Sequence, residues 1–169
     1  ASSLVLLGLF WLHLRKEDRA ARIGLMRWSK LSLLQTIGLA IGLIALGLVF
    51  NQLSATYVMP DVKVQESLRR MFEALPDTPF NMVMLFVAIA IIAPLLEEIL
   101  FRGFVQNALA KRLPAWGAIL GASAIFGVVH MDYHAFPALM MMGAVFGILY
   151  HKTGSLRVNI VAHMLNNGA

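Results

Sequence analysis

Five ionisable side chains lie inside segments that are otherwise apolar, and their types are those that carry out proton chemistry. They are Glu97, Glu98, Arg102, His130 and His163. A charged group inside a segment long enough to cross a bilayer is costly, so it is a functional candidate by default. Carboxylates and imidazoles can accept and donate protons near neutral pH. Their presence here therefore predicts general acid and base catalysis.

The two adjacent acids are expected to have different partners. Glu98 and Arg102 are four residues apart, so on a helix they share a face and can form an ion pair. Glu97 lies about 100° around the helix from Glu98, which turns its carboxylate toward a different neighbour. Pro94 lacks an N–H group and is expected to leave the carbonyl of Ala90 without its helical partner. A membrane protein tolerates such a break only beside protein or a water-filled cavity.

The middle histidine is expected at the same depth as the first acid. Phe126 and His130 share a helix face, so the aromatic ring can fix the orientation of the imidazole. Glu97 and His130 are equally distant from the turn around Leu113, which corresponds to about 25 Å along each helix. In an antiparallel hairpin, this carboxylate and this imidazole would therefore meet. Such a pair suits acid and base catalysis on a water molecule.

The last histidine belongs to a third pair, His163 and Asn167, on one face of the final segment. Together they offer hydrogen-bond donors for a developing oxyanion. As an alternative, Glu97, His130 and His163 have the ligand types of a catalytic zinc site. Counting from the turn at Gly154 makes His163 shallower than the other two residues. A tilted or broken helix is needed to close that gap.

Composition predicts the elements that hold these residues. Of the 169 residues, 59% are hydrophobic and 14% are charged, mean hydropathy is +0.75, and there is no cysteine. These values exclude an ordinary soluble domain, a disordered chain, a nucleic-acid-binding basic surface and a disulfide-stapled module. We expect an all-α, polytopic transmembrane helical bundle with about six membrane segments. They are 2–14, 31–50, 80–110, 114–131, 136–150 and 156–168. We expect one domain, 1–169, with trimmed ends and with the catalytic helices at about 80–168.

The cations indicate how these segments are oriented. The connections at 15–30, 111–112 and 151–157 together carry ten Lys and Arg residues. The intervening connections at 51–79 and 132–135 together carry three. Under the positive-inside rule, the basic connections lie in the cytoplasm.

In this order, the three pairs resemble the signature of the CPBP family of intramembrane proteases. That family includes type II CAAX prenyl endopeptidases and Abi or bacteriocin-immunity proteins. Its EExxxR, FxxxH and HxxxN motifs are matched by Glu97-Glu98-xxx-Arg102, Phe126-xxx-His130 and His163-xxx-Asn167. The similarity covers about residues 90–168. The earlier part matches only as generic membrane spans.

The resemblance implies a glutamate-dependent endopeptidase. In that interpretation Glu97 is the general base, His130 helps it to activate water, and His163 with Asn167 stabilises the oxyanion. Glu98, Arg102 and Phe126 then support the site. We expect no cofactor, with zinc at Glu97, His130 and His163 as the alternative. The expected partners are a membrane-associated peptide or protein substrate and the lipid bilayer, with no nucleic acid, in a bacterial inner membrane.

Two other functions are compatible with the same chain. A non-catalytic membrane scaffold or bacteriocin-immunity protein could keep the protease fold without its activity. A small transporter could use an intramembrane carboxylate relay, but the chain lacks the internal repeat that many transporters show.

Overall fold

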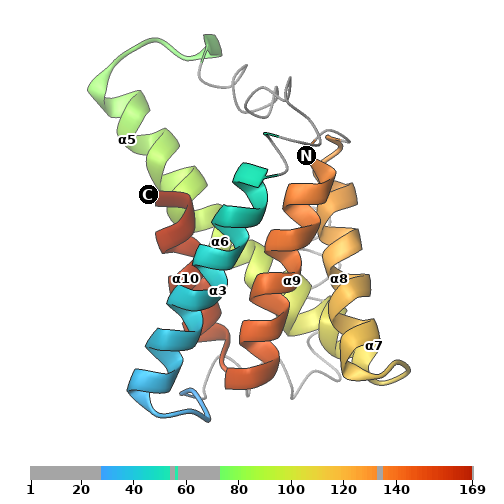
Figure 1. The fold of residues 1–169 in the computed structure, drawn as a ribbon. Coiled ribbons are helices and arrows are strands. Elements are labelled where there is room, and N and C mark those ends of the chain that lie inside the picture. The colour runs from blue at the N-terminus through green and yellow to red at the C-terminus, as the bar shows by residue number, and fades with distance from the viewer. Residues whose placement is uncertain (1–27, 54–55, 57–72, 133–134, 169) are drawn as a thin grey trace, which may run out of the picture.

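A computed structural model describes residues 28–53, 56, 73–132 and 135–168, and this part of the chain is all-helical, without strands (Figure 1). The helices are α3 (Leu33–Leu53), a long composite helix at 79–110, α8 (Ala115–Val129), α9 (Phe136–Thr153) and α10 (Leu156–Gly168). The all-α prediction is therefore confirmed for the described residues. The first predicted membrane segment, 2–14, lies outside them.

The number of membrane segments is not confirmed. Two helices in the described part are long and apolar enough to cross a bilayer, Leu33–Phe50 and Pro79–Ala110. A third apolar helix, α8, is shorter. Crossing a bilayer of about 30 Å takes about 20 apolar residues, whereas α10 has 13 residues and the last turn of α9 is polar. The six-segment prediction included 136–150 and 156–168, and both are shorter than a full span.

The composite helix at 79–110 departs from regular α-helical geometry at two places. It consists of α5 (Pro79–Val87), η2 (Ala88–Ile92), α6 (Ala93–Glu97), η3 (Glu98–Gln106) and α7 (Asn107–Ala110), in which η2 and η3 are π-helical. Its start is set by Thr78, whose side chain accepts from the N–H of Asn81, with Pro79 in the first turn.

The first π-helical segment accommodates the proline. The N–H of Ala93 donates to the carbonyl of Ala88, five residues back, and Pro94 begins the next α-helical turn. Pro94 thus lies at a position where a helix tolerates its missing N–H. We predicted a single break at Pro94. The structure distributes the irregularity over η2 and η3, and single-turn π-helical bulges often mark functional sites.

Helix α9 is the centre of the bundle, packed most extensively against α8 and next against α3 (Figure 1). Phe146 and Leu149 of α9 are fully buried in a cluster with Val145 and Ala162. A Cβ atom added at Gly143 would lie 3.0 Å from the Cα of Ser123. This glycine therefore allows the backbones of α8 and α9 to approach closely.

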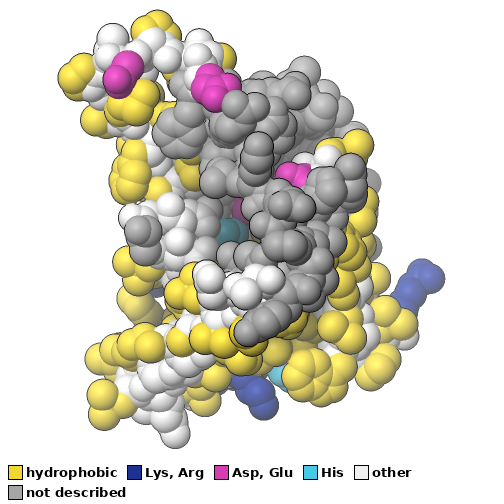
Figure 2. Space-filling view, turned by 45° about the horizontal axis from the view of Figure 1, so that its top comes forward, with side chains coloured by type: hydrophobic (Ala, Val, Ile, Leu, Met, Phe, Trp, Pro, Cys, Tyr) yellow, Lys and Arg dark blue, Asp and Glu magenta, His cyan; other side chains and the backbone are white. Residues whose placement is uncertain are grey.

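Basic residues of the described part gather at one end of the bundle. The turn between α7 and α8 carries Lys111 and Arg112, and it lies at the same end as the turn between α9 and α10 (Figure 1). The N–H of Lys30 donates to the carbonyl of Thr153 (2.8 Å), which joins the start of α3 to that end. In the space-filling view, Lys and Arg side chains are visible at the right and lower margins, and Asp and Glu side chains lie mostly in the upper half (Figure 2).

Candidate active site

The ion pair predicted from sequence spacing is present and fully buried. Nη1 of Arg102 lies 3.0 Å from Oε1 of Glu98, and the side chains are 2% and 0% exposed. Nη2 of Arg102 also donates to the carbonyl of Gly143 on α9 (2.9 Å). The guanidinium lies over the rings of Phe126 and Phe146, at 5.0 and 5.5 Å. The pair therefore anchors η3 to the centre of the bundle.

Asn159 completes the environment of Glu98 and was missed by sequence reasoning. Its Nδ2 donates to Oε2 of Glu98 (3.1 Å) and to the carbonyl of Phe146 (2.6 Å). Asn159 is fully buried. The available signal was an amide, one of three in the final segment, that lies between apolar residues. Nothing in its spacing indicated a partner 61 residues away.

Glu98 also holds the last histidine. Nδ1 of His163 lies 2.8 Å from Oε1 of Glu98. The ring of His163 stacks on that of Phe146, with centroids 4.4 Å apart and an interplanar angle of 25°. These two contacts fix the plane and direction of the ring, so that its Nε2 points toward Glu97. The stacking partner could not be recognised from sequence, because Phe146 is one apolar residue among many.

Glu97 faces both histidines. Its Oε1 lies 3.9 Å from Nε2 of His130, and its Oε2 lies 3.7 Å from Nε2 of His163. The two acids differ in one neighbour each, Arg102 for Glu98 and His130 for Glu97, but they share His163, which the sequence did not predict. The side chains of Glu97 and His130 are 25% and 23% exposed, whereas His163 is 5% exposed. The gap between Glu97 and His130 is therefore partly open, whereas His163 is enclosed.

The depth gap predicted for His163 is closed by the course of α10. This helix packs against η2, α6 and η3, that is, along the middle of the composite helix. His163, on α10, thereby comes to the carboxylate of Glu97, on α6. Counting residues from the turn at Gly154 underestimated its reach, because that count assumed parallel helices.

The backbone determines which nitrogen of His130 carries a proton. Nδ1 of His130 lies 2.7 Å from the carbonyl oxygen of Phe126. A carbonyl can only accept, so Nδ1 must donate. In the neutral ring, Nε2 is then an unprotonated acceptor, and this is the atom that faces Glu97. The ring of Phe126 lies 4.6 Å from that of His130, which is the contact their spacing predicted.

Asn167 lies one turn beyond His163 and contacts the composite helix. Its Nδ2 donates to the carbonyl of Ile89 (3.3 Å). In η2 the N–H of Ala93 donates to the carbonyl of Ala88, five residues back. The equivalent donor for the carbonyl of Ile89 would be the N–H of residue 94, which is a proline and has none. The side-chain amide of Asn167 supplies this missing donor. We had expected an unpartnered carbonyl at Ala90. The carbonyl that receives a side-chain donor is instead that of Ile89, because π-helical hydrogen bonds join residues five apart and not four.

The zinc alternative gains no geometric support. Within the described residues, no group of three or more His, Asp or Glu side chains is arranged to hold a metal ion. The ligand types of Glu97, His130 and His163 still suit zinc. The zinc site thus stays a prediction.

Comparisons with known proteins place the site within a family. Residues 79–169, which include every predicted site residue, match the family model described as type II CAAX prenyl endopeptidase Rce1-like. The chain belongs to this family. The family resemblance inferred from the three motifs is thereby confirmed. Family membership and the two long apolar helices together indicate a membrane protein.

Two curated relatives are similar to part of this chain. The protein named "Putative membrane peptidase YdiL" of Bacillus subtilis (strain 168) is 34% identical over 95 residues, covering 56% of this chain and 39% of its own length. The "Membrane-embedded CAAX protease MroQ" of Staphylococcus aureus (strain USA300) is 40% identical over 86 residues, covering 47% of this chain and 35% of its own. The chain thus matches less than half the length of each. No solved structure matches.

Proposed function

We propose that this chain is the catalytic region of an intramembrane endopeptidase that hydrolyses a peptide bond in a membrane-associated peptide or protein. One observation carries the proposal: the carboxylate of Glu97 lies between the Nε2 atoms of His130 and His163. The Nδ1 atoms of both rings are held by other partners. Membership of the Rce1-like family supports the same reaction.

The first step is the activation of water by Glu97 and His130. Their nearest atoms are 3.9 Å apart, too far for a direct hydrogen bond. A water molecule about 2.8 Å from each atom fits beside this gap. Its oxygen attacks the carbonyl carbon of the scissile bond, while one of its protons passes to Glu97. His130 orients this water by accepting its second proton in a hydrogen bond at Nε2.

The second step is stabilisation of the tetrahedral oxyanion by His163 and Asn167. Because Nδ1 of His163 bonds to Glu98, its Nε2 donates only when the ring carries a proton on both nitrogens. The side-chain amide of Asn167 has two N–H groups, and one of them is used by Ile89. The other is available to an oxyanion.

The third step breaks the C–N bond. Glu97 returns the proton that it took from the water to the leaving nitrogen, so the products are an amine and a carboxylic acid. No proton or electron is gained or lost by the enzyme over the cycle. In this scheme Glu98 holds His163 (2.8 Å) and Phe126 holds His130 (4.6 Å). Arg102 compensates the charge of Glu98 from 3.0 Å.

The test is hydrolysis by the purified chain in lipid nanodiscs. Apolar peptides and prenylated CAAX peptides are offered separately, and the products are identified by mass spectrometry. We expect Glu97→Gln to lower the rate by at least about 100-fold, the usual contribution of a general base. Glu73→Gln is the matched control, because Glu73 is exposed and lies outside the site. Cleavage by Glu97→Gln at the control rate would refute this mechanism.

The protein is further proposed to cross a bacterial inner membrane several times, with its basic end in the cytoplasm. The gathering of basic turns at one end of the bundle supports this orientation. Single cysteines introduced at Lys111 and Asp77 are labelled with a membrane-impermeant reagent in intact spheroplasts, which expose the outer face, and in inverted membrane vesicles, which expose the cytoplasmic face. The chain has no native cysteine to interfere. Labelling of position 77 from the cytoplasmic side would contradict the proposal.

A further inference from the structure

Asn159 contacts both of the groups that hold the ring of His163. Those groups are the carboxylate of Glu98, 2.8 Å from Nδ1 of His163, and the ring of Phe146, stacked at 4.4 Å. Nδ2 of Asn159 donates to Oε2 of Glu98 (3.1 Å) and to the carbonyl of Phe146 (2.6 Å). Asn159 lies four residues before His163 on α10, so the two side chains share a face of the helix. One side-chain amide therefore joins α10, η3 and α9 beside the histidine.

The carboxylate of Glu98 is shared between two donors. Its Oε1 lies 3.0 Å from Nη1 of Arg102 and 2.8 Å from Nδ1 of His163. Within the described residues, Nη1 of Arg102 makes this ion-pair contact but no hydrogen bond. Guanidinium and carboxylate groups favour a bidentate arrangement with two parallel N–H···O bonds. Rotation of the Glu98 carboxylate toward that arrangement would take Oε1 away from His163.

Asn159 opposes this rotation. Oε2 of Glu98 accepts from its amide, and the bond from the same amide to Phe146 keeps the amide in place. Both neighbours are acceptors, so both N–H bonds of Nδ2 are used and the orientation of the amide is fixed. Glu98 and Asn159 are both fully buried. Turning the carboxylate would therefore leave a buried N–H without an acceptor, which is costly.

We propose that Asn159 is a positioning residue that keeps Glu98 turned toward His163 and thereby keeps Nε2 of His163 directed at the reacting carbonyl. The inference rests on the proposed function, in which His163 stabilises the oxyanion. Asn159 touches no reacting atom and acts through Glu98 and Phe146.

The position of the ring proton of His163 follows from the same contacts. A carboxylate at Nδ1 keeps the proton of the neutral ring on that nitrogen. If Glu98 turned to Arg102, Nδ1 would lose its acceptor. The proton would then favour Nε2, where the carboxylate of Glu97, 3.7 Å away, can accept it. Loss of Asn159 should therefore change the tautomer of His163.

The first test is the rate of peptide hydrolysis by the full chain in lipid nanodiscs. We expect Asn159→Ala to lower kcat about 10-fold, the effect of removing a residue that orients a functional side chain, with KM little changed. The oxyanion exists only in the transition state, so a misdirected His163 affects kcat and not substrate binding.

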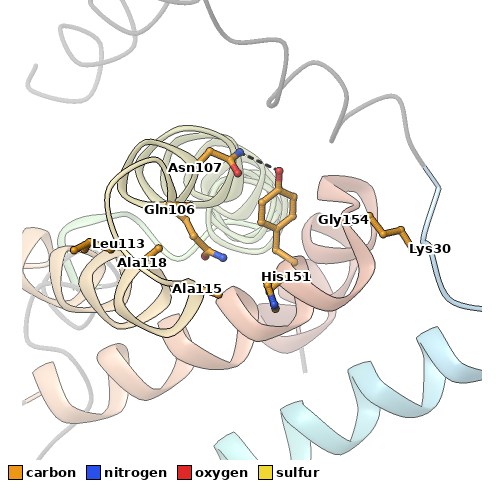
Figure 3. Close-up of a pocket in the computed structure, with 10 residues that line it drawn as sticks. Lys30, Gln106, Asn107, Leu113, Ala115, Ala118, His151 and Gly154 are labelled. Carbon is orange, nitrogen blue, oxygen red and sulfur yellow. Dashed lines mark hydrogen bonds between the residues drawn. The ribbon is translucent and has the colours of Figure 1, made fainter.

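Gln106→Ala is the matched control. Gln106 is also a buried amide that donates to a carbonyl of α9, that of Gly147 (3.1 Å), but it lies two turns beyond Glu98. It belongs to the wall of a cavity of about 290 Å³, whose lining includes neither Glu98 nor His163 (Figure 3). We expect the folded fraction of Gln106→Ala to keep the kcat of the wild type.

A double-variant cycle separates positioning from a general loss of structure. His163→Ala removes the group on which Asn159 acts, so adding Asn159→Ala to it should lower kcat no further. Asn159→Ser is the second variant and replaces Asn159→Ala in the cycle if the latter does not fold. Its single O–H cannot serve both acceptors, so its kcat should lie between those of Asn159→Ala and the wild type.

The second test uses ¹⁵N NMR of histidine-labelled protein and needs no hydrolysis. At a pH where the rings are neutral, the nitrogen shifts distinguish a proton on Nδ1 from one on Nε2. The signals of His163 are those missing in His163→Ala. We expect Nδ1–H in the wild type and in Gln106→Ala, and a shift toward Nε2–H in Asn159→Ala. If the wild type cleaves no peptide but this shift is observed, the proposed function fails and the positioning role of Asn159 stands.

Three results would overturn the inference. The first is a wild-type tautomer of His163 in Asn159→Ala. The second is an equal fall in kcat for Asn159→Ala and Gln106→Ala, which would mean that any lost amide has the same effect. The third is a full additional loss of kcat when Asn159→Ala is combined with His163→Ala.

Discussion

Removing the guanidinium of Arg102 should destabilise the protein far more than removing a surface cation. In Arg102→Met the carboxylate of Glu98 would stay buried, at 0% exposed. It would no longer have the positive charge of the guanidinium, which lies 3.0 Å away in the wild type. Leaving one partner of a buried ion pair uncompensated costs about 3–5 kcal/mol. For a chain of this size, that loss corresponds to a fall in Tm of about 6–20 °C.

A double variant separates the charge effect from the loss of packing. In Glu98→Gln/Arg102→Met both charges are absent, and replacing a buried pair by uncharged groups is often nearly neutral. We expect it to regain at least half of the stability that Arg102→Met loses. It should not regain all of it, because the hydrogen bond from Arg102 to Gly143 is absent in both variants. That bond contributes about 1.5–3 kcal/mol as a charge-assisted bond.

The assay is thermal unfolding in detergent and in nanodiscs, followed by circular dichroism. Arg157→Met is the matched control: Arg157 is exposed and lies over Trp28 at 5.2 Å, a contact worth about 0.5–1 kcal/mol. The reasoning fails if Arg102→Met is as stable as Arg157→Met. It also fails if the double variant is no more stable than Arg102→Met, because the penalty would then not come from the unpaired carboxylate.

Three further predictions concern the surroundings of the site. Asn159→Ala should lower stability by about 1–3 kcal/mol, because it leaves acceptors unsatisfied, and Asn159→Asp should lower it more by placing a second carboxylate beside Glu98; chemical denaturation compares the two. Gly143→Ala should destabilise by about 1–3 kcal/mol through the contact with Ser123, whereas Gly38→Ala, with nothing within 4 Å, should be neutral or stabilising; equal Tm values would contradict this. If the mechanism needs no metal, exhaustive chelation should leave peptide hydrolysis unchanged, and loss of activity that is restored by zinc would favour the zinc alternative.

Local spacing made much of the site predictable from the sequence. Helix geometry alone makes residues four apart neighbours, so it predicted the contacts of Glu98 with Arg102 and of Phe126 with His130. The chain's apolar composition likewise made its few charged groups stand out, since burial in lipid or protein requires each to have a partner. These inferences need no knowledge of how helices cross.

The tertiary structure decided how the three pairs converge. Asn159 reaches Glu98 across 61 positions, and His163 reaches Glu97 because α10 runs along the middle of the composite helix. Spacing along one helix carries no information about the crossing of another. The same holds for the donation of Asn167 to Ile89, which depends on the π-helical register that η2 adopts before Pro94. The sequence thus determined which chemical groups are present and which of them pair along one helix. Helix packing determined that His130 and His163 both face the carboxylate of Glu97.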